Sequence, residues 1–183
     1  PFVLEYAMIE LRTERFLPRP IRAKDAARLV ELANDPLIAR NTARVPHPYT
    51  IEDAQAFLAH AASAFDSGTE YPFAVCEDDL MIACAGIMPL CEAIAETGYW
   101  VGADHRRRGV ATEATAAVIR FGFEELELDT IEAGYFTDNP VSGRVLERLG
   151  FQRTGEIVKT HSVGRGGDAD TVRMILRRED WRI

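Results

Sequence analysis

The chain has 183 residues, 47% of them hydrophobic and 27% charged, with a formal net charge of −8. This length suits one domain with a sizeable core, and the composition is ordinary for a soluble globular protein. The acidic balance argues against a nucleic-acid-binding surface, because such surfaces are usually basic. No apolar run reaches the length of a membrane span, and we expect no signal peptide.

Three cysteines bear on the cellular compartment and on metal binding. Cys76, Cys84 and Cys91 lack C-x-x-C spacing and lie in predicted strands. We therefore predict reduced, packed thiols, no metal site and a location in the reducing cytoplasm.

The first part of the chain predicts one strand and two helices. Ile9–Phe16 reads as a strand, and apolar residues at helical spacing predict a helix over Ala23–Asn34 that ends before Pro36. Thr50 is the predicted cap of a second helix, which ends near Gly68.

Three strands and a long helix follow. Tyr71–Cys76 and Met81–Pro89 are predicted strands joined by the polar turn Glu77–Asp79, and Ile94–Val101 is a third strand. An apolar stripe with helical spacing then predicts a helix from about Val110 to Leu126.

The last part adds a strand over Thr130–Phe136, a helix over Asn139–Leu149 and strands over Phe151–His161 and Thr171–Leu176. The glycine-rich segment Gly164–Asp168 reads as a hairpin turn, because it lacks the helix and the Lys-Ser/Thr ending of a phosphate loop. The order β-α-α-β-β-β-α-β-α-β-β predicts a mixed sheet flanked by helices.

The basic turn Arg106–Ala111 lies between the strand over Ile94–Val101 and the helix from Val110. The first turn of a helix offers unpaired N–H groups and a partial positive charge, and Gly109 allows a close approach of the backbone. The turn therefore predicts a site for phosphate or pyrophosphate. The alternative is a solvated basic turn that happens to precede a helix.

Several stretches, taken together and in order, resemble the GNAT superfamily of acyl-CoA N-acyltransferases. Arg106-x-x-Gly109-x-Ala111 is similar to the Q/R-x-x-G-x-G/A signature with which this family cradles the pyrophosphate of coenzyme A. The other matching motifs are Glu96–Val101, Ala111–Ala114, Asn139–Ser142 and Leu146–Phe151. Thr13–Arg15 and Pro20–Asp25 match the Rim-type branch, named for enzymes that acetylate the N-termini of ribosomal proteins.

The resemblance implies a single domain over residues 9–181, preceded by an N-terminal extension over residues 1–8. The implied fold is α/β (α+β), with a mixed, mostly antiparallel sheet of about seven strands, flanked by helices and splayed between its central strands. The implied activity is transfer of an acetyl group from acetyl-CoA to a primary amine, on a protein N-terminus or a small molecule. A non-catalytic acyl-CoA sensor or scaffold of the same fold is the alternative, and a homodimer is compatible with the family.

The resemblance also implies where coenzyme A binds. Unpaired backbone groups at Trp100 and Val101 would bind the pantetheine arm as an added strand would. The pyrophosphate would bind Arg106, Arg107, Arg108, Gly109, Val110, Ala111 and Thr112. Asn139 would bond the pantetheine arm, with simple N-capping as the alternative.

Two residues are the implied catalytic groups. Ser142 would face the thioester sulfur and hydrogen-bond the departing thiolate, although many family members use a tyrosine and none lies in Asn139–Phe151. Glu96 is the predicted general base, because alternation places it on the strand face of Trp100, where partial burial would raise its pKa. A backbone N–H near Val101 would stabilise the oxyanion.

Glu113, His161 and water remain alternative bases. The acceptor amine is expected opposite the coenzyme, between the first two helices, the loop Asn41–Tyr49 and the loop before Thr171. Tyr49, His47 and Trp100 are candidate lining residues. Composition does not decide between a peptide and a small amine.

Overall fold

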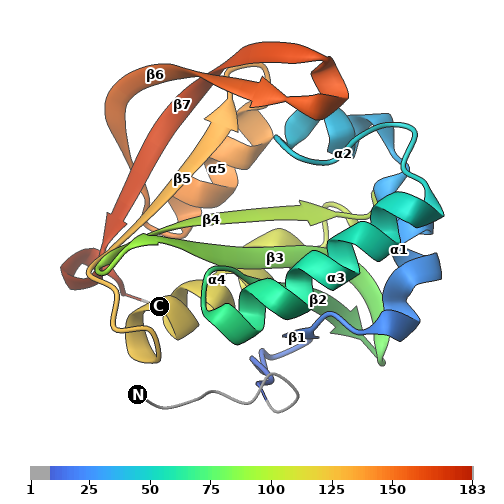
Figure 1. The fold of residues 1–183 in the computed structure, drawn as a ribbon. Coiled ribbons are helices and arrows are strands. Elements are labelled where there is room, and N and C mark those ends of the chain that lie inside the picture. Colours follow the sequence, from blue (N-terminus) through green and yellow to red (C-terminus); the bar gives the residue numbers. More distant parts are fainter. Residues whose placement is uncertain (1–8, 183) are drawn as a thin grey trace.

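The computed structural model describes residues 9–182 and contains one seven-stranded sheet in the order β1-β2-β3-β4-β5-β7-β6 (Figure 1). Neighbouring strands are antiparallel except for the parallel pair β4 and β5. The predicted α/β class with a mixed, mostly antiparallel sheet is therefore confirmed. The extension predicted over residues 1–8 lies outside the described residues.

The strands from the second to the sixth agree closely with the predicted ranges, whereas the last strand begins at Gly167 and not at Thr171. The strands are β1 (Leu17–Pro20), β2 (Tyr71–Glu77), β3 (Leu80–Cys91), β4 (Ile94–Val101), β5 (Thr130–Phe136), β6 (Gln152–Ser162) and β7 (Gly167–Arg177).

The strand predicted over Ile9–Phe16 is wrong, because the chain makes a closed turn there before β1 begins. The Thr13 hydroxyl accepts from the Phe16 N–H at 2.9 Å, and the Thr13 N–H donates to the Phe16 carbonyl at 3.1 Å. A threonine that bonds nearby backbone groups offers the chain an alternative to a strand ladder.

The helices are α1 (Ala26–Ala33), α2 (Pro36–Asn41), α3 (Ile51–Ser67), α4 (Val110–Glu124) and α5 (Pro140–Arg148). Short 3-10 turns lie at Ala23–Asp25, Ala103–His105, Val163–Arg165 and Arg178–Asp180.

Helix α2 is not predicted from the sequence. Pro36 reads there as the signal that ends α1, whereas Pro36 is also the first residue of α2. Asp35 accepts the N–H of Leu37 at 2.8 Å as the cap, and a proline in the first turn loses no helical hydrogen bond.

Helices cover both faces of the sheet, with α3 on one face and α4 on the other (Figure 1). Side-chain alternation along β2 sends Phe73 and Val75 into one apolar core with α4, and Ala74 and Cys76 into a second core with α1. Among residues 9–182, no helix is long and apolar enough to cross a bilayer.

The sheet opens between its two central strands. β4 and β5 pair only at three positions, the last of which joins Glu96 to Glu132. Beyond Glu96 the remainder of β4 pairs with β3 on its other side and leaves its edge toward β5 free. The predicted splay is thus present, and it creates the opening around which the candidate site is built.

Candidate active site

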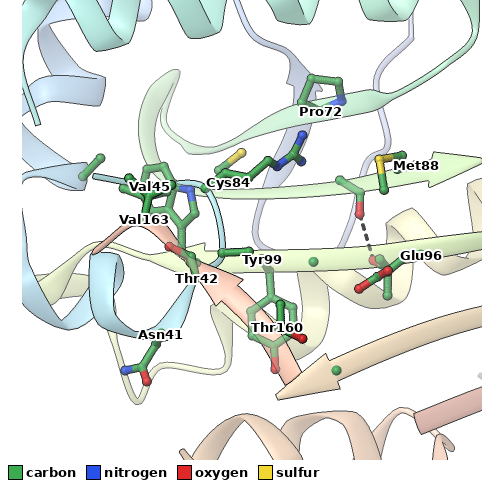
Figure 2. A pocket seen from close by; sticks show the side chains of 18 of the residues that line it. Asn41, Thr42, Val45, Pro72, Cys84, Met88, Glu96, Tyr99, Thr160 and Val163 are labelled. Atoms are coloured by element: carbon green, nitrogen blue, oxygen red, sulfur yellow. Dashed lines mark hydrogen bonds between the residues drawn. The ribbon is translucent and has the colours of Figure 1, made fainter. Parts of the chain in front are cut away.

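A cavity of about 1030 Å³ occupies the splay and reaches both faces of the sheet. Its lining includes Glu96, Gly98 and Trp100, which share one face of β4, together with Tyr99 and Ser142 from the side of α5. Figure 2 shows Glu96 and Tyr99 at different points along one strand of this cavity. Two molecules that enter from opposite faces could therefore meet in the gap.

The carboxylate of Glu96 lies in this cavity, as predicted, and it is paired. Nη1 of Arg173 lies 3.2 Å from Oε1 of Glu96, and Nη2 lies 2.5 Å from Oε2 of Glu132. Burial opposes the charge on Arg173, but the two carboxylates outweigh this effect and raise the pKa of the guanidinium. Glu96 is 35% exposed, so its second oxygen has room to accept a proton from a ligand.

Glu113, a predicted alternative base, instead anchors the chain before β1. It accepts hydrogen bonds from the Thr13 hydroxyl at 2.6 Å and from the backbone and side-chain nitrogens of Arg15 at 2.8 Å. Burial works to raise the pKa of Glu113, but these bonds outweigh it and lower the pKa. Glu113 lies in a second, smaller pocket with Thr13 and Arg15. The motif Thr13–Arg15 therefore contacts the motif Ala111–Ala114, and this contact accounts for the presence of both motifs in the chain.

His161, the other alternative, pairs with Asp168 across the β6–β7 hairpin at 3.0 Å and is 66% exposed. Among the described residues of β6, Thr160, the neighbour of His161, lines the cavity. Within residues 9–182, no group of three or more His, Cys, Asp or Glu side chains is arranged to hold a metal ion.

The basic turn before α4 has the geometry of an open helix N-terminus. Gly109 is the N-cap residue, has a φ of 82° and contributes no side-chain cap. A Cβ atom at Gly109 would lie 2.9 Å from Nη2 of Arg15. The first N–H groups of α4 are therefore not blocked by a capping side chain, and the left-handed backbone angle favours glycine at this position.

The three arginines of this turn have different surroundings. Arg106 pairs with Asp35 and donates from Nε to the Val101 carbonyl at 3.1 Å. Arg108 pairs with Glu77 at 2.6 Å. Arg107 is exposed, and no ion pair joins it to another described residue. Only Arg107 therefore offers an uncompensated charge to an anion at this turn.

At the start of α5, Asn139 is the N-cap, and its side chain accepts from the Ser142 N–H at 3.5 Å. Oγ of Ser142 lies 2.9 Å from Oη of Tyr99. Burial raises the pKa of Tyr99 to about 12, partly offset by the bond to Ser142. No tyrosine lies in α5, and Tyr99 of β4 contacts the start of this helix at Ser142.

The cavity also holds a buried carboxylate that the sequence did not reveal. Glu70 accepts two hydrogen bonds from Arg44, at 2.9 and 2.5 Å, and contacts Nε2 of His60 at 2.9 Å. Burial opposes the ionised form, but Arg44 and His60 outweigh it and lower the pKa of Glu70. Tyr49 and Trp100 line the cavity as expected, whereas His47 is not among the described lining residues.

One wall of the cavity joins α2 to the tip of the β6–β7 hairpin. The Ser162 hydroxyl donates to the Thr42 carbonyl at 2.8 Å, and the Val163 N–H donates to the Ala43 carbonyl at 2.9 Å. Asp138 then binds both Arg165 and Arg40, at 2.7 and 2.8 Å. Figure 2 shows Asn41, Thr42, Val45 and Val163 at this side of the cavity.

Comparison with known proteins identifies the family and the fold. Residues 15–152 match the family model described as an acetyltransferase (GNAT) domain. The chain is 29% identical over 137 residues to a probable N-acetyltransferase, YjcK, of Bacillus subtilis, covering 72% of this chain and 76% of YjcK. It is 33% identical over 84 residues to the [ribosomal protein uS5]-alanine N-acetyltransferase of Escherichia coli, covering 46% and 43% of the two chains.

A structure of Mycobacterium smegmatis RimJ in complex with CoA-disulfide shares the fold, with a TM-score of 0.79 at 22% identity over 90% of this chain and 82% of RimJ. The family match covers most of the chain and contains β4, the basic turn, α4 and α5. The chain therefore belongs to the GNAT family of N-acetyltransferases and is an acyltransferase.

Proposed function

We propose that this enzyme transfers an acetyl group from acetyl-CoA to a primary amine by direct attack. The observation that carries the proposal is the cavity at the splay, which is lined by Glu96 and Ser142 and by residues from both faces of the sheet. Holding amine and thioester together in such a space supplies much of the rate of an acyl transfer.

The fit of acetyl-CoA rests on features of β4, α4 and α5. The free edge of β4 at Trp100 and Val101 can bond the amides of the pantetheine arm. The open N-terminus of α4, from Arg106 to Thr112, suits the pyrophosphate, with Arg107 as its main free charge. Asn139 caps α5 and would bond the arm near Ser142.

In the proposed reaction, Glu96 accepts a proton from the acceptor ammonium and passes it to water, and the free amine then attacks the thioester carbonyl carbon. The nitrogen of the tetrahedral intermediate gives its second proton to Glu96. A backbone N–H near Val101 stabilises the oxyanion. Collapse of the tetrahedral intermediate breaks the C–S bond and leaves the electron pair on sulfur. The thiolate departs toward Ser142 and the positive end of α5.

The proposed acceptor is a primary amine, either a protein N-terminus or a small molecule. The name of the E. coli relative favours the former for that protein. In this chain the acceptor end of the cavity carries Glu70, Arg44 and His60, so an acceptor with polar groups beside its amine suits the site.

Thermal unfolding with acetyl-CoA tests the use of this substrate. At a ligand concentration one hundred times the dissociation constant, we expect about 2.7 kcal/mol of added stability. The Gly109→Ala variant should lose most of this gain, because the new methyl group meets Arg15 in a left-handed backbone position. An unchanged melting temperature of the wild type with saturating acetyl-CoA or CoA would refute the proposal.

A further inference from the structure

Tyr99 and Ser142 meet across the gap between β4 and α5. Oη of Tyr99 lies 2.9 Å from Oγ of Ser142 and 3.3 Å from the Ser142 carbonyl oxygen. Both residues line the cavity, and Tyr99 belongs to the part of β4 that no longer pairs with β5. The pair therefore stands beside the space proposed for the thioester.

Tyr99 is suited to donate a hydrogen bond and unsuited to give up its proton. Burial raises the pKa of its phenol to about 12, and the bond to Ser142 offsets this only in part. A thiol has a pKa of about 8.5, so the phenol is a much weaker acid than the thiol that a departing thiolate would form. Tyr99 thus stays protonated over the working pH range.

Either hydroxyl can donate in the 2.9 Å contact, and we take Tyr99 as the donor, because a phenol is more acidic than an aliphatic hydroxyl and is the stronger hydrogen-bond donor. A serine oxygen can accept one hydrogen bond while its own proton is donated elsewhere. When Tyr99 donates to Oγ, the Ser142 proton is free to point into the cavity. Ser142 stands in the first turn of α5, where the helix dipole favours negative charge, and linked hydrogen bonds polarise one another.

We infer that Tyr99 is a positioning residue for departure of the thiolate, because its hydroxyl directs the Ser142 O–H at the leaving sulfur. This inference rests on the proposed use of acetyl-CoA. As the C–S bond breaks, its electron pair stays on sulfur, and the proton of the attacking amine goes to Glu96. The thiolate accepts the Ser142 hydrogen bond until water protonates it, and Tyr99 keeps its proton throughout.

Binding of CoA and of desulfo-CoA, which lacks only the sulfur, tests the inference without an acceptor amine. Calorimetric titrations between pH 7 and pH 10 give the affinity of each ligand. In the wild type, the affinity of CoA relative to desulfo-CoA should rise about tenfold with pH, because one unit of thiol pKa depression corresponds to a tenfold preference for the thiolate.

Tyr99→Phe should reduce this pH-dependent gain by about threefold or more, and Ser142→Ala should abolish it. A purely structural defect would weaken both ligands equally, so their ratio isolates the effect on sulfur. The double variant should show no further loss beyond Ser142→Ala, because both changes remove one shared interaction.

Tyr71→Phe is the matched control, since Tyr71 is a buried core tyrosine that is not among the described residues lining the cavity. Tyr71→Phe should keep the full pH-dependent rise in the affinity of CoA relative to desulfo-CoA. The inference is overturned if Tyr99→Phe also keeps the full gain, or if CoA and desulfo-CoA bind the wild type equally at every pH. Failure of both ligands to bind the wild type would instead overturn the proposed function and, with it, this inference.

Discussion

The three adjacent arginines of the turn before α4 illustrate how partners from distant segments decide the role of a residue. The spacing of Arg106, Arg107 and Gly109 predicted an anion site, but it could not show which charges were free. Arg106 is held by Asp35, which lies 71 positions earlier in the chain. Such pairings appear only when the fold brings the segments together.

Arg107→Ala should lower the affinity for CoA about fivefold, which corresponds to about 1 kcal/mol, and should weaken its dependence on salt. Its free energy of unfolding should stay unchanged. Arg106→Ala should instead lower the free energy of unfolding by about 1–3 kcal/mol, because it leaves the part-buried Asp35 without its cation. Calorimetric titration at two ionic strengths and urea unfolding would measure both effects, and the reverse pattern would contradict these assignments.

Glu96→Gln should lower kcat/KM by about 10²- to 10⁴-fold, the usual contribution of a general base, while CoA binds within about twofold of the wild type. Glu132→Gln is the matched control, because Glu132 shares Arg173 but is not among the described residues that line the cavity. Steady-state rates across pH would measure the difference. Equal rates for wild type and Glu96→Gln at every pH would remove Glu96 as the base.

At the scale of the elements, the sequence predicted β2 to β7 and the main helices because their periodicity is long and uniform. The errors lie where a single side chain redirects the backbone, at Thr13 and at the Asp35–Pro36 cap. Glu96 and Ser142 were found through motifs and share one cavity. Tyr99 and Arg173 were missed as residues of the candidate site because their partners lie 43 and 77 positions away.

The contact between α2 and the β6–β7 hairpin gives a prediction about the cavity wall. A Cβ atom at Gly164 would lie 2.5 Å from the backbone of Ala39, so Gly164→Ala should cost about 1–3 kcal/mol of stability. That loss corresponds to roughly 2–4 °C in Tm for each kcal/mol. Gly167→Ala lies in the same hairpin, and its new methyl group would meet no described atom within 4 Å, so this variant should melt within about 1 °C of the wild type. Equal melting temperatures for the two variants would refute the close contact.

For the whole molecule, buried carboxylates set the response to acid. Burial opposes ionisation of Asp25, but its bonds to Arg19, at 2.8 and 2.9 Å, outweigh this and lower its pKa below the usual 3.8. A lowered pKa contributes stability that is present above about pH 4 and is lost as the pH falls through the folded-state value. The pKa of Glu70 is also lowered, so its ionised form likewise contributes stability that is lost as the pH falls.

Asp25→Asn should therefore lower the free energy of unfolding by about 3–5 kcal/mol at pH 7, because the buried Arg19 keeps, among the described residues, only Asp79, 3.8 Å from its Nε, as a counter-charge. The loss should shrink as the pH falls through the folded-state pKa of Asp25, because the wild-type carboxylate then becomes protonated as well. Urea unfolding at several pH values measures this, and a loss that does not change with pH would contradict the role of this ion pair.

The proposed reaction as a whole is tested most directly by acetyl transfer from acetyl-CoA to a panel of amines. The panel should contain small amines and peptides with free N-termini, with release of CoA followed by a thiol reagent and the acceptor weighed by mass spectrometry. We expect CoA release that requires both enzyme and amine, together with an acetylated amine. Saturable binding of acetyl-CoA with no acetylated acceptor in the panel would contradict the proposal that the cavity brings amine and thioester together.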